Sequence, residues 1–129
     1  MNYEFPILIV GYKRVDETIR MINEVINYGF KNLYLAIDGD SDLSTKKKWE
    51  NELARLKSEQ LDINVKVWHR ETNLKLACSM ITAIDWIFKF ETKAIILEDD
   101  LHFDKRFFSY ISDNFHYVER GLVFMLSGN

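Results

Sequence analysis

The sequence has little cysteine, little proline and no long apolar run. Its single cysteine, Cys78, excludes an internal disulfide and a zinc site built from cysteines, which is typical of proteins in a reducing compartment. The N-terminal stretch MNYEFPILIVGY lacks a basic region, and its apolar run is too short for a signal peptide or a membrane span. We therefore expect a soluble, cytoplasmic protein without a transmembrane segment.

The sequence also lacks a large excess of charge of one sign. Its formal net charge is −3, and the lysines and arginines are scattered among aspartates and glutamates. This pattern does not produce the broad basic surface that holds nucleic-acid phosphates. Nucleic acid is therefore not an expected partner.

Nothing in the sequence divides the chain into parts. It has no repeat, low-complexity tract or linker, and its one proline, Pro6, interrupts no predicted element. A chain of 129 residues with 47% hydrophobic content and nine phenylalanines is sufficient for one packed core. We expect a single domain over residues 1–129.

Short apolar runs alternate along the chain with segments of helical periodicity. Strands are predicted over residues 6–12, 32–39, 63–70, 93–100 and 122–129, and helices over residues 15–28, 44–60, 75–90 and 104–119. This alternation predicts an α/β fold with three layers, α/β/α, around a mostly parallel sheet. Apolar and polar residues alternate in the strand 63–70, which places it nearer an edge of the sheet.

Polar side chains follow the predicted strands at their carboxyl ends, where sheets of this kind bind ligands. These residues are Tyr12, Lys13 and Arg14 after the first strand, Asp38 and Asp40 after the second, Arg70 and Asn73 after the third, and Glu98, Asp99 and Asp100 at the end of the fourth. We expect them to converge on one rim of the sheet. By contrast, Trp68, Trp86 and the helix aromatics are interpreted as core residues, and His69 and His102 as structural residues.

The most informative stretch is KAIILEDD, a nearly unbroken apolar strand that ends in Glu98, Asp99 and Asp100. Three adjacent carboxylates repel one another strongly when they are poorly solvated, unless a cation offsets their charge. Oxygen ligands favour Mn²⁺ or Mg²⁺, which carboxylates hold together with substrate phosphates. The alternative is a solvated acidic turn that precedes a helix capped by Asp104.

The order of segments PILIVGYKR, LYLAIDGD, RETNLKLA and AIILEDDLHFDKRFFSY resembles the donor half of GT-A glycosyltransferases, in particular the N-acetylglucosaminyltransferase I group. In that group, a strand ending in EDD and followed by a paired-aromatic FF helix forms the metal and donor site. The resemblance covers nearly the whole chain and implies a nucleotide-diphospho-sugar transferase-like fold of the GT-A type. It also implies that Asp100 binds the metal, Asp99 the ribose and Glu98 the transferred sugar.

The resemblance further implies that Arg14 and Asp38 hold the uracil ring of a UDP-sugar, with Tyr12 and Lys75 also on the nucleotide. The chemistry agrees, because a carboxylate accepts the imide hydrogen of uracil and a guanidinium stacks on the base. Each residue also has a plainer interpretation. Arg14 would be a solvated loop residue, Asp38 the first residue of an Asp-Gly turn, and Lys75 a surface lysine rather than a phosphate ligand.

The function implied is metal-dependent transfer of a sugar from a UDP-sugar donor to a hydroxyl of a glycan or other acceptor. Two alternatives remain open. One is a catalytically inactive nucleotide-binding domain. The other is a haloacid dehalogenase-like phosphohydrolase, because LYLAIDGD resembles the nucleophile motif of that family. A complete βα unit before that motif disfavours the phosphohydrolase. Enzymes of the GT-A family continue past the donor half into an acceptor region that supplies the catalytic base. We therefore expect this chain to be the N-terminal part of a longer enzyme, inactive alone, with self-association at an exposed sheet edge.

Overall fold

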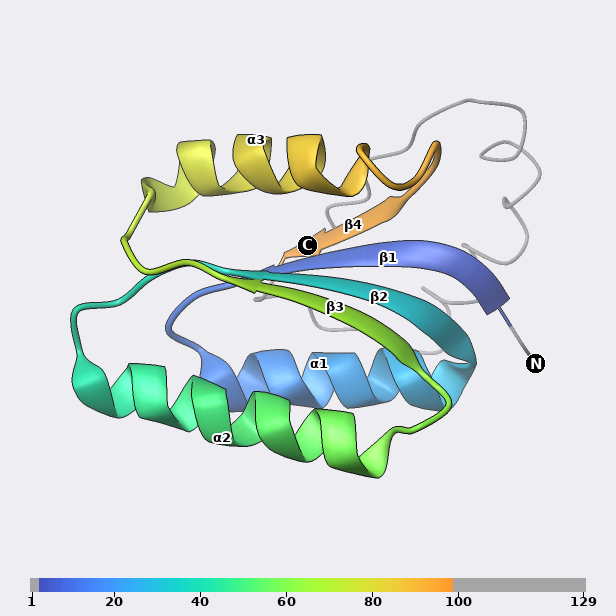
Figure 1. Cartoon of the computed structure of the whole chain (residues 1–129), viewed down its shortest axis with the longest axis horizontal. Coiled ribbons are helices and arrows are strands. Elements are labelled where there is room, and N and C mark those ends of the chain that lie inside the picture. Colours follow the sequence, from blue (N-terminus) through green and yellow to red (C-terminus); the bar gives the residue numbers. More distant parts are fainter. Residues whose placement is uncertain (1–2, 99–129) are drawn as a thin grey trace.

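The computed structural model of the chain describes residues 3–98 (Figure 1). Strands and helices alternate over this whole range: β1 (Tyr3–Gly11), α1 (Val15–Tyr28), β2 (Phe30–Ile37), α2 (Leu43–Glu59), β3 (Asn64–His69), α3 (Lys75–Ile87) and β4 (Ile95–Glu98). The α/β alternation predicted from the sequence is confirmed for these residues, with element ends that differ by a few positions. The elements predicted at 104–119 and 122–129 lie outside the described residues.

The four strands form one parallel sheet in the order β3-β2-β1-β4. From β1 the chain builds the sheet first toward β2 and β3, and then crosses back to add β4 on the other side of β1. The direction of winding therefore reverses between β1 and β4, where Ile7 pairs with Ile95 and Val10 with Glu98. As predicted, β3 lies at an edge of the described sheet and is only partly buried.

Helices cover both faces of the sheet (Figure 1). On one face, Ile9 and Leu35 belong to a cluster that includes Trp49 of α2. On the other face, Leu8 and Tyr34 pack with Ala83 and Ile87 of α3. Successive strand residues alternate between the two clusters because strand side chains point to opposite faces. Burial of each large apolar side chain contributes roughly 1.5–3 kcal/mol, so both faces stabilise the sheet.

Local signals account for the helix ends. Gly29 ends α1 with a φ of 119°, and its N–H bonds the carbonyls of Ile26 and Val25. That left-handed conformation suits glycine because it has no Cβ. Asp42 caps the start of α2, since its carboxylate accepts the Ser44 N–H at 3.0 Å. None of the helices in residues 3–98 combines the length and apolar character that crossing a bilayer requires.

The interpretation as core residues is wrong for Trp68 and for Phe88 and Phe90 of the predicted helix 75–90, which are exposed, whereas Trp86 does pack against the core cluster under α3. Trp68 is 36% exposed. It lies on the edge strand β3, where the neighbouring helix leaves part of the indole open to solvent.

Candidate functional site

A cavity of about 310 Å³ opens at the carboxyl ends of β1 and β2, beside the first turns of α3. Its lining includes Val10, Tyr12, Asp38, Asn73, Lys75 and Ser79. Three residues that the sequence assigns to nucleotide binding, Tyr12, Asp38 and Lys75, thus share one cavity although they are far apart along the chain. The cavity lies next to the reversal between β1 and β4, the position at which parallel α/β sheets commonly bind ligands.

Asp38 is the most constrained residue of this cavity. Its side chain is almost completely buried, and its Oδ1 accepts the Gly39 N–H at 3.0 Å and the Leu74 N–H at 2.9 Å. Its own N–H donates to the Gly11 carbonyl at 2.8 Å. A buried carboxylate needs such donors, because burial without them is costly. Asp38 therefore ties the ends of β1 and β2 to the loop that leads into α3.

Gly39 lets this loop approach the end of β2 closely. A Cβ added at Gly39 would lie 2.5 Å from the carbonyl carbon of Thr72. Backbone atoms cannot come that close, so a larger residue requires the loop to move. The Asp-Gly pair therefore has two separate tasks here: the aspartate binds the loop, and the glycine leaves room for it.

Lys75 begins α3 in a left-handed backbone conformation, with a φ of 63°. Asn73 supports this conformation, because its Oδ1 accepts the Lys75 N–H at 2.6 Å. A non-glycine residue in this region costs on the order of 1 kcal/mol, and strained residues of this kind cluster at functional sites. The side chain of Lys75 is exposed and lines the cavity.

Tyr12 is positioned through its backbone. Its carbonyl accepts the indole N–H of Trp49 at 2.6 Å, and this bond connects the loop after β1 to the buried face of α2. The Lys13 ammonium lies 5.3 Å from the centre of the Tyr12 ring. The bond to Trp49 therefore fixes the backbone of the loop, while the Tyr12 ring remains partly exposed at the cavity.

Arg14 is not among the residues that line the cavity. It stands at the N-cap of α1, with its side chain more than half exposed and 3.6 Å from the Glu17 carboxylate. Its carbonyl accepts the Thr18 N–H and hydroxyl, at 2.9 and 2.7 Å. An exposed ion pair of this length is weak, so the guanidinium is easily released.

Glu98 is the last described residue, and its backbone pairs with Val10 at the cavity. This register places the start of the acidic triplet beside the end of β1. Asp99 and Asp100, the residues assigned to ribose and metal binding, lie outside the described residues, as does His102. Within residues 3–98, no group of three or more His, Cys, Asp or Glu side chains is arranged to hold a metal ion.

The sequence places Arg70 at this rim but gives no sign of its partners. The guanidinium is almost fully buried and donates to the Ser79 hydroxyl at 2.6 Å, the Ser79 carbonyl at 3.0 Å and the Thr82 hydroxyl at 2.8 Å. Burial lowers the pKa of Arg70, while the nearby negative charge of Asp38 raises it. Arg70 thereby fixes α3 against the end of β3. The sequence signal for this contact is a pair of hydroxyl residues, Ser79 and Thr82, three positions apart on α3.

Comparison of the chain with protein-family models, with curated proteins and with solved structures finds no match. What the described residues define is a parallel sheet covered by helices, with a cavity at the carboxyl ends of its central strands that is lined by both apolar and polar residues.

Proposed function

We propose that the chain is the nucleotide-sugar-binding part of a metal-dependent glycosyltransferase with the three-layer GT-A fold, and that the cavity beside Asp38 receives the nucleotide of a UDP-sugar. One observation carries the proposal. Tyr12, Asp38 and Lys75 line a single cavity at the reversal of the sheet, and the backbone register brings the start of the Glu98-Asp99-Asp100 triplet to the same place.

The cavity offers chemistry that matches the parts of a nucleotide. Asp38 uses Oδ1 for two backbone N–H groups, which leaves its second oxygen to accept the imide hydrogen of uracil. The Tyr12 ring supplies an aromatic surface for the base. The exposed Lys75 ammonium suits a phosphate oxygen. Arg14 lies outside the cavity, and its weak exposed ion pair with Glu17 leaves the guanidinium available to move toward a bound base.

The metal belongs to the acidic triplet. Asp100 would bind Mn²⁺ or Mg²⁺, Asp99 the ribose and Glu98 the sugar, as the resemblance implies. A divalent ion held there would supply positive charge that offsets the negative charge of the donor diphosphate. The glycan or other acceptor is bound by a region that the donor residues do not supply.

Calorimetry of the full chain with UDP tests the proposal. We expect binding to be stronger with Mn²⁺ than without it, and Asp100→Ala to lose the metal-dependent part of the affinity. Asp38→Asn should reduce the preference for UDP over GDP by about 1.5–3 kcal/mol, the range for a hydrogen bond to a charged group. Asp62→Asn is the matched control, because Asp62 is exposed, pairs with Lys31 at 3.8 Å and precedes β3, at the amino ends of the strands and thus at the opposite end of the sheet from the cavity.

Two results would contradict the proposal. One is that Mn²⁺ leaves the affinity for UDP unchanged, both in the parent chain and in Asp100→Ala. The other is equal affinity of the parent chain for UDP and GDP.

A further inference from the structure

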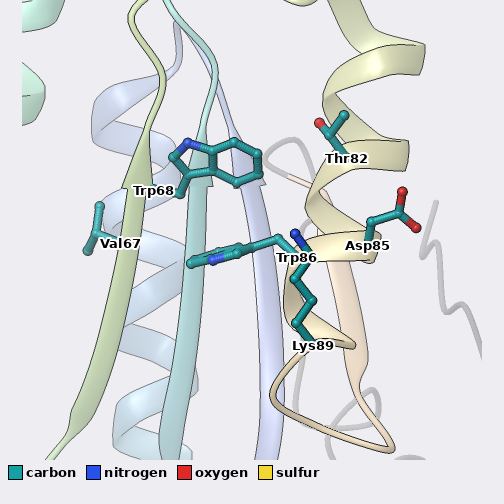
Figure 2. Close-up of a pocket in the computed structure, with 6 residues that line it drawn as sticks. All are labelled: Val67, Trp68, Thr82, Asp85, Trp86 and Lys89. Carbon is teal, nitrogen blue, oxygen red and sulfur yellow. The ribbon is translucent and has the colours of Figure 1, made fainter.

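A second cavity, of about 430 Å³, lies between α3 and the edge strand β3 (Figure 2). It shares no lining residue with the cavity beside Asp38. Val67 and Trp68 of β3 form one wall, and Thr82, Asp85 and Trp86 of α3, with Lys89 just after the helix, form the other. Its size falls within the range of roughly 300–1,000 Å³ that is usual for small-molecule sites.

Two indole rings dominate this cavity, and neighbouring side chains hold both of them in place. The rings of Trp68 and Trp86 lie 5.6 Å apart between centroids and are inclined by 59° (Figure 2). The Arg70 guanidinium packs on the Trp68 ring at 4.3 Å, and Tyr34 meets Trp86 edge to face at 5.4 Å. Because the two rings are also in contact with each other, they form a fixed aromatic surface, and a ligand that packs on it does not have to order the rings.

Asp85 and Lys89 are the polar groups available at the rim. Both side chains are exposed, and within residues 3–98 neither enters an ion pair or a side-chain hydrogen bond. The Thr82 hydroxyl, in contrast, is occupied, because it accepts from Arg70 and donates to the Cys78 carbonyl at 2.6 Å. The cavity therefore presents one carboxylate, which only accepts hydrogen bonds, and one ammonium, which only donates them.

We propose that this cavity binds the pyranose ring of a saccharide, at a site separate from the nucleotide cavity. The C–H groups on a sugar face are weakly positive and are attracted to the electron-rich faces of the indoles. Sugar hydroxyls both donate and accept, so the same ligand satisfies Asp85 and Lys89.

The shape and the charge of the cavity favour a sugar over other ligands. A planar base binds best in a slot with parallel walls, and no slot exists between two rings that are inclined by 59° and in contact at a centroid distance of 5.6 Å. A puckered pyranose ring needs no slot, because the C–H groups on one of its faces pack on a single aromatic surface. The opposite charges of Asp85 and Lys89 cancel, which favours a neutral ring over an anion or a cation.

The test uses the indole N–H signals of the ¹⁵N-labelled full chain, whose three tryptophans give three signals. Titration with methyl glucoside, methyl galactoside and cellobiose should shift the signals of Trp68 and Trp86 until they saturate. The Trp49 signal should stay, because that indole is buried under the other face of the sheet and donates to the Tyr12 carbonyl.

Variants separate binding from folding. Asp85→Ala and Lys89→Ala alter exposed residues and should each weaken saccharide binding by about tenfold, the loss expected for a hydrogen bond to a charged group. Leu61→Ala, at a residue that is 86% exposed and outside both cavities, should bind as the parent does.

The proposal is overturned if no saccharide shifts the Trp68 and Trp86 signals, or if uridine or adenosine shifts them where saccharides do not. It is equally overturned if both Asp85→Ala and Lys89→Ala retain the parent affinity.

Discussion

At the scale of single residues, two charged side chains show how this chain combines burial with polarity. Asp38 and Arg70 are each about 5% exposed, yet their hydrogen bonds go to backbone groups and hydroxyls. Each is therefore tied to a different piece of backbone, Asp38 to the loop before α3 and Arg70 to α3 itself. The cavity beside Asp38 keeps its shape because these two residues fix the loop and the helix that form its walls.

Lys75 offers a prediction about strain at this site. Lys75→Gly removes the Cβ at a φ of 63°, and Lys75→Ala retains it, while both remove the ammonium. In urea unfolding, we expect the free energy of unfolding of Lys75→Gly to exceed that of Lys75→Ala by about 1 kcal/mol, because glycine adopts this φ without strain. The greater entropy of glycine in the unfolded chain reduces this difference. Both variants should bind UDP more weakly than the parent. Equal stabilities of the two variants would show that the left-handed backbone carries no strain.

At the scale of elements, the loop between β3 and α3 connects the sheet to the cavity. It packs on Gly39, presents the Leu74 N–H to Asp38 and ends in the strained start of α3. Because all three features are local to one short loop, a shift of the loop changes the cavity without disturbing the sheet.

Gly39→Ala tests this dependence. The added Cβ would meet the Thr72 backbone at 2.5 Å, so we expect a loss of about 1–3 kcal/mol in the free energy of unfolding, typical of overpacking. The Leu74 amide should exchange its hydrogen faster, because its bond to Asp38 is disturbed. Gly11→Ala is the control, since its nearest neighbour is a side-chain methyl of Thr18 at 3.2 Å, which adjusts more easily. A larger loss of stability in Gly11→Ala than in Gly39→Ala would count against this account.

The sequence predicts the elements of this fold better than the contacts between them. Apolar periodicity locates α1 and β3, and Gly29 predicts the end of α1, because these signals act over a few residues. Periodicity does not predict which residues of other elements a side chain will contact. The exposure of Trp68 depends on how far α3 covers the edge strand, and the partners of Arg70 depend on the rotation of α3. The conformation of Lys75 is also hidden, because lysine has no preference for a positive φ.

At the scale of the whole molecule, the two apolar clusters depend on the same strands. Neighbouring residues of β1, such as Leu8 and Ile9, belong to opposite clusters. Neither layer of helices therefore has a sheet of its own to pack on, and loss of one cluster removes the support of the other.

This sharing predicts one cooperative unfolding transition. Leu35→Ala in the cluster under α1 and α2, and Leu8→Ala in the cluster under α3, should each lower the free energy of unfolding by about 2–5 kcal/mol. Urea transitions followed by tryptophan fluorescence and by far-ultraviolet circular dichroism should coincide in both variants. A variant in which the two signals separate would mean that the layers unfold independently.

The central place of β1 has a consequence for synthesis on the ribosome. One side of β1 pairs with β2, which is synthesised soon after it. The other side pairs with β4, so Ile7 has no strand partner on that side until Ile95 has been synthesised. At roughly 5–20 residues per second, the interval between the end of β1 at Gly11 and the end of β4 at Glu98 lasts about 4–17 s. During that time β1, whose residues 7–10 are all buried in the folded protein, has an open edge, at which another growing chain or a chaperone can bind. The order of the strands thus makes β4 the element whose arrival ends the period of greatest risk of misassembly.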